Sequence, residues 1–201
     1  MATGFLGVLV TYWMLEPQST SAEAAHRQTV LAQQEQHSQR FARAVEHLGE
    51  QAPDRLQTRL GAVHELGQLA HEAPARQPAI IDILSEWIRR TTPRPTHPAT
   101  CPESVAPDVQ AALTVLGERN SAHDGKSRID LSATCLRRVN LSRGKFENAL
   151  LNRTDLNRAN LTGTRLHGAE LREGASVIDA KHDGTTDISD VSGNPVGAWW
   201  R

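Results

Sequence analysis

A large apolar residue stands at every fifth position between Ile129 and Glu173. A period of five fits neither the 3.6-residue turn of a helix nor the two-residue alternation of a strand. These residues can be buried together only if each pentapeptide forms one side of a four-sided coil of about twenty residues, with coils stacked at about 4.8 Å. The predicted core of this coil is Leu131, Leu136, Leu141, Phe146, Leu151, Leu156, Leu161, Leu166 and Leu171.

The pattern resembles the pentapeptide-repeat family, whose repeat is roughly A-(D/N)-L-x-x. The closest matches are Val139-Asn140-Leu141, Thr154-Asp155-Leu156 and Ala159-Asn160-Leu161. The resemblance implies a right-handed quadrilateral β-helix. Residues 41–49, 59–63 and 108–117 are in addition similar to segments of a bacterial subfamily that has an N-terminal helical region, often membrane-anchored, before its repeats. The resemblance therefore implies an α+β fold in which an N-terminal α-helical region precedes a short β-helix.

The chain divides into four predicted segments. Residues 1–17 are an apolar N-terminal segment, and residues 18–120 form the helical region, with a Pro-rich linker at 91–107. The β-helix takes residues 121–176. Residues 177–201 form a C-terminal tail that folds over the last coil. The tail ends with Trp199 and Trp200, which either cap the open end of the coil or bind a partner.

The N-terminal segment carries no charge between Gly4 and Leu15. As a helix, residues 2–15 would span about 21 Å, which is short of the roughly 30 Å hydrocarbon core of a membrane. Three interpretations stay open: part of a transmembrane helix that begins outside this sequence, an interfacial anchor, or a helix buried against the body. We therefore expect membrane association, where it occurs, to use residues 4–15.

The helical region shows the spacing of amphipathic helices. Residues 21–48 predict a long helix that is polar at its start and apolar at its end, where Gly49 is a stop signal. Asp54 is the predicted N-cap of the next helix, and Pro78 opens a third. A short helix follows over residues 109–116.

The two cysteines, Cys101 and Cys135, fall in different regions, and Cys135 is expected to point outward from the coil. Their number and spacing predict neither a disulfide framework nor a metal site. This composition suits a reducing compartment, so we expect a cytoplasmic protein, tethered to the inner face of the cell membrane where the N-terminal segment inserts.

The sequence offers no recognisable catalytic constellation. His64-Glu65 begins a zinc-protease motif, but Gln68 stands where the second histidine is required. Glycine-rich phosphate loops and nucleophile motifs are missing from the sequence as well. We therefore predict a protein that is not an enzyme and that uses no cofactor.

The outer surface of the coil suggests a binding face. The twenty-residue period stacks Arg138 on Arg158, with Arg137 alongside. Eight basic and five acidic side chains between Ile129 and Glu173 give a formal balance of +3. This face is either simply solvated or a site for an acidic partner, lipid headgroups or nucleic acid.

Some pentapeptide-repeat proteins are thought to protect DNA gyrase by imitating DNA, which requires a long, acidic rod. The sign of this balance argues against such mimicry, and we expect no nucleic-acid partner. The preferred hypothesis is an interaction or scaffold protein that presents the β-helix to an unknown protein partner near a membrane. The alternative is a regulatory module that binds an acidic partner or ligand through the arginine face.

Overall fold

The computed structural model describes residues 6–50, 52–95 and 101–200, with side chains from residue 22 onward. The chain forms two compact units, Met1–Arg40 and Phe41–Arg201. Helix α1 (Leu6–Leu48) begins in the first unit, where the side chains of residues 22–36 are all exposed. Residues 4 and 5 of the apolar segment lie outside the described residues. Among the described residues, none of the helices combines the length and the hydropathy that a membrane crossing requires.

The second unit begins with the last turns of α1, which enter a packed core. Ala44 and Leu48 are each 2% exposed. The helix ends at Leu48, and the amide of Gly49 donates to the carbonyl of Glu46 at 3.0 Å, which confirms the predicted stop. The predicted start at residue 21 is wrong, because the helix already begins at Leu6. Within the predicted range, the exposed residues 22–36 and the buried Ala44 and Leu48 follow the predicted change from polar to apolar.

The described residues of the helical region form three further α-helices: α2 (Leu56–Glu72), α3 (Gln77–Thr91) and α4 (Pro107–Glu118). Short 3₁₀ turns, η1 (Pro53–Arg55) and η2 (Pro74–Arg76), precede α2 and α3. The predicted N-cap at Asp54 is wrong. Pro53 begins the 3₁₀ turn one residue earlier, so Asp54 lies inside that turn and makes no side-chain cap bond.

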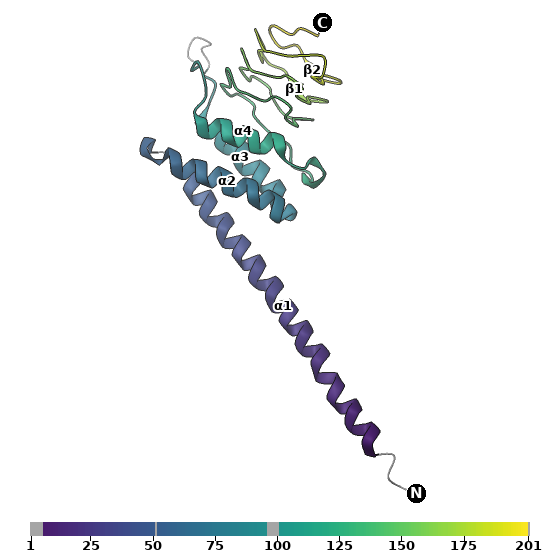
Figure 1. Ribbon diagram of the computed structural model, residues 1–201. Helices are drawn as coiled ribbons and strands as arrows, with labels where there is room; N and C mark the ends of the chain where they lie inside the picture. The colour runs from purple at the N-terminus through teal and green to yellow at the C-terminus, as the bar shows by residue number, and fades with distance from the viewer. Residues whose placement is uncertain (1–5, 51, 96–100, 201) are drawn as a thin grey trace. The chain divides into compact units, whose positions relative to one another are not determined.

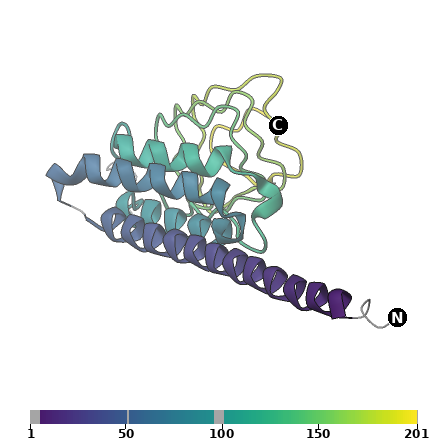
Figure 2. The same ribbon diagram turned by 60° about the horizontal axis from the view of Figure 1, so that its bottom comes forward.

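These helices pack around fully buried leucines and isoleucines, among them Leu66, Leu84, Ile88 and Leu113. Figure 2 shows α2 and α4 side by side, with α4 nearer the coil. A buried ion pair joins α2 to α4, because the guanidinium of Arg59 donates to Asp108 at 2.6 Å and Asp108 is only 1% exposed. The helical core and the inside of the coil form one continuous apolar cluster.

The repeats fold as a coil in which residues twenty positions apart pair in parallel. Four bridge positions recur at intervals of five residues: Asp130 with Leu150, Cys135 with Asp155, Asn140 with Asn160, and Lys145 with Arg165. The predicted inward residues are confirmed as the core of the coil, because all nine are at most 3% exposed. The repeat spacing therefore sets both the pairing and the packing.

Each pentapeptide turns at a residue in the left-handed region of backbone conformation. This residue lies two positions after the buried one, and φ ranges from 54° at Glu173 to 67° at Gly163. The full set is Ala133, Arg138, Arg143, Asn148, Arg153, Arg158, Gly163, Gly168 and Glu173. Exposed side chains at these turns therefore project from the coil at regular intervals.

The coil continues past Leu171, where the leucine series ends. Asp155 pairs with Ser176, Asn160 with Lys181 and Arg165 with Asp187, so the register grows from twenty to twenty-one and then twenty-two residues. The two continuous strands, β1 (Glu170–Leu171) and β2 (Ser192–Gly193), pair in parallel within this part. Much of the predicted tail thus forms a further coil.

The helical region closes the lower edge of the first coil, next to α4 (Figure 1). Higher in the coil, the amide at each bridge position donates to the coil below. In the first coil, the same four amides donate to acceptors of the helical region instead. The amide of Asp130 donates to the Ser85 hydroxyl at 3.4 Å and that of Cys135 to Thr92 O at 2.8 Å. The amide of Asn140 donates to Gln110 Oε1 at 2.8 Å and that of Lys145 to Gly117 O at 2.9 Å.

Candidate interaction surface

The predicted arginine face lies on one side of the first two coils. Arg137 and Arg138 belong to the first coil, and Arg158 to the second. Arg138 and Arg158 occupy equivalent left-handed turn positions, with φ of 56° and 60°. Each of these two side chains is 49% exposed, so both guanidinium groups reach solvent.

Carboxylates accompany all three guanidinium groups. Arg138 Nη2 lies 2.8 Å from Glu103 Oε2, and Arg137 Nη1 lies 3.9 Å from Glu103 Oε1. Arg137 Nε is also 3.8 Å from Asp155, and Arg158 Nε is 3.8 Å from Asp179. The three arginines therefore share a face, as predicted, but that face is charge-paired and not openly basic. The repeat pattern could not reveal the pairing with Glu103, because Glu103 belongs to a distant segment of the chain.

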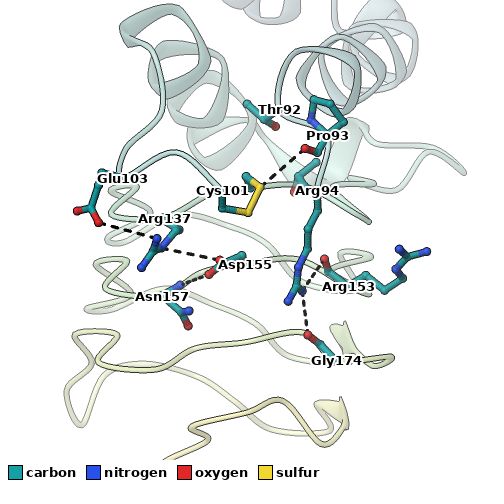
Figure 3. The surroundings of a disulfide bond; sticks show 12 residues. Thr92, Pro93, Arg94, Cys101, Glu103, Arg137, Arg153, Asp155, Asn157 and Gly174 are labelled. Atoms are coloured by element: carbon teal, nitrogen blue, oxygen red, sulfur yellow. Dashed lines mark hydrogen bonds and ion pairs between the residues drawn. A yellow bond between two sulfur atoms is a disulfide. The ribbon is translucent and has the colours of Figure 1, made fainter. Parts of the chain in front are cut away.

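Glu103 belongs to a strap that we define as residues 92–95 and 101–106. The strap pairs with the coil through an antiparallel bridge between Pro93 and Thr134. The amide of Arg94 donates to Ala133 O at 2.7 Å. Its guanidinium donates to Arg153 O at 2.9 Å and to Gly174 O at 2.8 Å, so it reaches two further coils (Figure 3). The Pro-rich linker expected here is thus partly a bound arm.

A disulfide between Cys101 and Cys135 fastens the strap to the coil (Figure 3). The two Cα atoms are 5.5 Å apart. The expectation that these cysteines stay unpaired is wrong. Cys135 does project to the outside of the coil, but strap pairing places Cys101 over it and leaves Cys135 only 3% exposed. The cysteine count alone could not reveal this pairing because it depends on a bridge between distant backbones.

Comparison with protein families matches residues 134–173 to eight copies of the repeat described as Pentapeptide repeats. The chain contains pentapeptide repeats. Comparison with curated proteins and with solved structures gave no match. Pentapeptide repeats imply a β-helix and suggest a non-enzymatic repeat protein. The resemblance to a subfamily with an N-terminal helical region stays a prediction.

The pentapeptide-repeat array extends beyond the matched residues, and the sequence holds a signal for this extension. The inward pair of a small residue and a larger one resumes at Ala175 and Val177, which are 0% and 1% exposed. It recurs at Thr186 and Ile188, after one extra residue in each of two pentapeptides. A search that allows one-residue insertions would therefore have found this coil.

The end of the array carries the tryptophan pair. Trp199 stacks on the ring of His182 with 4.1 Å between centroids, and Trp200 meets Trp199 edge-on at 4.5 Å. Both tryptophans are half-buried against the apolar cluster. These contacts support a capping role for both rings.

A polar cleft of about 750 Å³ lies between the loop 121–128 and the side of the array. Arg128 spans it, donating to Asn148 O at 2.7 Å and to Glu170 at 3.0 Å. The hydrogen bond from Arg128 holds the pKa of Glu170 below its ordinary value. The wall of the cleft is thus tied together by its own charges.

The helical region contains a smaller, mainly apolar pocket of about 170 Å³, lined by His64, His71, Ile80 and Val115 among others. The His64 ring is hydrogen-bonded to Gln68 at 3.0 Å, within one helix. In the part of the chain that the structure describes, no group of three His, Cys, Asp or Glu side chains is placed to hold a metal ion.

Proposed function

We propose that this chain is a non-catalytic interaction protein whose pentapeptide-repeat array, a right-handed quadrilateral β-helix, presents a rigid surface to a protein partner. The observation that carries this proposal is the closed lower edge of the array. All four bridge amides of the first coil are satisfied by the helical region. An open edge would invite strand addition, whereas a capped array offers its sides.

The sides of the array suit this role because only two of every five side chains serve the core. Six of the nine left-handed turn residues are exposed, the turns are evenly spaced, and each side carries a different set. Arg143, Asn148, Arg153 and Arg158 represent the four sides in turn. These outward residues can vary without disturbing the packing of the core. The surface can therefore be specific for one partner.

Site-specific photo-crosslinking in cells that produce the full chain tests this proposal. A photoreactive residue replaces Arg143, Asn148, Arg153 or Arg158 in turn, with Gln33 on the exposed part of α1 as the control position. We expect one protein to be captured from one side of the array or from two adjoining sides. Equal capture from all four positions and from Gln33 would contradict a docking surface.

A second candidate function is binding of an acidic partner through Arg137, Arg138 and Arg158. The observation that favours it is the carboxylate of Glu103, which already lies against two of these arginines. Under this alternative the face is regulated, since the strap must yield before a partner binds. The two candidates share the same array and differ in the side that is used.

We propose in addition that residues 4–15 hold the chain close to a membrane. Their uncharged sequence supports this location. The predicted cytoplasmic side depended on unpaired cysteines, whereas a disulfide favours an oxidising compartment and thus the opposite face of that membrane. Alkylation of acid-quenched cells tests the side, and rapid modification of both cysteines before any reductant is added would place the chain in the cytoplasm.

A further inference from the structure

We propose that the Cys101–Cys135 disulfide gates a surface for an acidic peptide, formed by Arg137 and Arg138 and occupied in the oxidised protein by Glu103. This inference rests on the proposed interaction function and deepens it by naming the partner chemistry and its control. The strap is then both a tether and a built-in competitor of the partner.

The covalent geometry supports the gate. Glu103 lies two residues after Cys101, and Arg137 lies two residues after Cys135, so the disulfide holds the Glu103 carboxylate next to the Arg137 guanidinium (Figure 3). Glu103 is 64% exposed, and exposed ion pairs are weak when nothing else holds them together. The tether supplies a high effective concentration, which lets a weak contact persist and exclude a free peptide.

The occupant indicates the chemistry of the partner. Arg138 meets one oxygen of the Glu103 carboxylate and Arg137 faces the other. Asp155 lies against Arg137 Nε, whereas Arg137 Nη1 faces the Glu103 carboxylate that occupies the surface. Planar guanidinium groups suit carboxylates in this arrangement. A peptide with acidic side chains can therefore take the place of Glu103, and Arg158 extends the surface along the array.

A dithiol reductant breaks the covalent tether of residues 101–106 and leaves the hydrogen bonds of residues 92–95 in place. Its thiolate attacks the Cys101 sulfur, since Cys101 is partly exposed whereas Cys135 is buried. The bond between the two cysteine sulfurs breaks, and Cys135 leaves as a thiolate that takes up a proton. The second thiol of the reductant then closes its own disulfide and frees the Cys101 thiol. The reductant is oxidised by two electrons and the protein disulfide is reduced by two.

Fluorescence anisotropy with a labelled poly-glutamate peptide tests the gate on the purified full chain. We expect the dithiothreitol-reduced protein to bind this peptide about five-fold more tightly than the oxidised protein. Glu103→Ala keeps the disulfide and should give the same gain without reduction. This variant removes the competing carboxylate and keeps the disulfide. It therefore tests the gate even where reduction of the disulfide unfolds part of the chain.

Matched arginine variants assign the gain to a position. Arg138→Ala should abolish it, whereas Arg143→Ala, at the equivalent left-handed turn on another side, should retain it. Equal affinity of the oxidised, reduced and Glu103→Ala proteins would overturn the gate. An equal gain for single-stranded DNA or for anionic vesicles would overturn the assignment to an acidic peptide.

The two proposals fail separately. If the gate is absent but the crosslinks from another side persist in cells, the interaction function stands and this inference does not. If the peptide responds to reduction but none of the array positions crosslinks in cells, the gate is real in vitro and the proposed function is lost.

Discussion

At the scale of single residues, the array is held by local compensation between neighbouring side chains. Phe146 is larger than the leucines at the equivalent positions, and Gly144 precedes it by two residues. A Cβ at position 144 would lie 2.5 Å from Phe146 Cε2. The glycine thus provides the volume that the ring requires, and the pair behaves as one unit.

Gly144→Ala should lower the free energy of unfolding by about 1–3 kcal/mol, because it overfills the core. The double variant Gly144→Ala/Phe146→Leu restores the combination found at Ala149 and Leu151 and should recover the part of that loss that the ring causes. The part due to Leu141 O, which would lie 2.9 Å from the added Cβ, should remain. Urea denaturation of the four proteins of this double-mutant cycle measures the coupling. Additive losses would show that the ring and the glycine act independently.

Asp183 organises the second one-residue insertion of the array. Its Oδ1 accepts from the amides of Gly163 and Thr185, at 3.2 and 3.0 Å, and from the hydroxyls of Thr185 and Thr186, at 2.7 and 3.3 Å. The hydrogen bond from the Thr185 hydroxyl is the largest cause that lowers the pKa of this carboxyl. The ionised form is therefore the one that the fold stabilises.

This pKa direction fixes the sign of a pH dependence. A carboxyl with a lowered pKa in the folded state stabilises the protein fully above its unfolded pKa, about 4, and loses that contribution as the pH falls through the lowered value. Asp183→Asn should be less stable than the parent protein at pH 7, and the difference should narrow as the pH falls below about 4. Urea titrations across this range provide the test.

At the scale of elements, a side chain of α4 substitutes for a strand. Gln110 Nε2 donates to Asn140 O, and Gln110 Oε1 accepts from the amide of Asn140, both at 2.8 Å. The two bonds reproduce the exchange that a neighbouring coil would supply. An amide on a helix thereby closes one side of the array.

Gln110→Ala should cost about 1–2 kcal/mol of stability, because it removes two net hydrogen bonds and leaves an edge amide with only water. Denaturant unfolding gives the loss, and the exchange rate of the Asn140 amide should rise. Gln68→Ala is the matched control, since Gln68 is an exposed glutamine bonded only within its own helix. An unchanged Asn140 exchange rate would mean that Gln110 does not cap this edge.

The elements that follow from the repeat were predictable from the sequence, whereas contacts between distant segments were not. The five-residue period of the leucines predicted the pairing register and the buried face, because every repeat has its inward residue at the same position. The strap could not be predicted, since Pro93 and Thr134 pair without any shared periodicity. The disulfide and the charge pairing of Arg138 both depend on that bridge, so both were missed together. The leucine period did not predict the last coil, because one-residue insertions interrupt the five-residue spacing while the inward side chains still pack in the core.

At the scale of the whole molecule, the helical region and the array within residues 41–201 share one apolar cluster and the four edge hydrogen bonds. Short repeat arrays depend on their caps, because each coil is stabilised mainly by its neighbours. We therefore expect these two parts to unfold together, even though their secondary structures differ.

Leu69→Ala tests this coupling from a distance. Leu69 is fully buried in α2, and its truncation should cost about 2–5 kcal/mol. Hydrogen exchange resolved by segment should show the opening free energy falling by the same amount in α2 and at Leu151 and Leu156. Leu31→Ala, at a side chain that is 63% exposed in the first unit, should leave both unchanged. If exchange accelerates in α2 alone, the array is stable without its cap, and the closed lower edge would no longer explain why the sides are the docking surface.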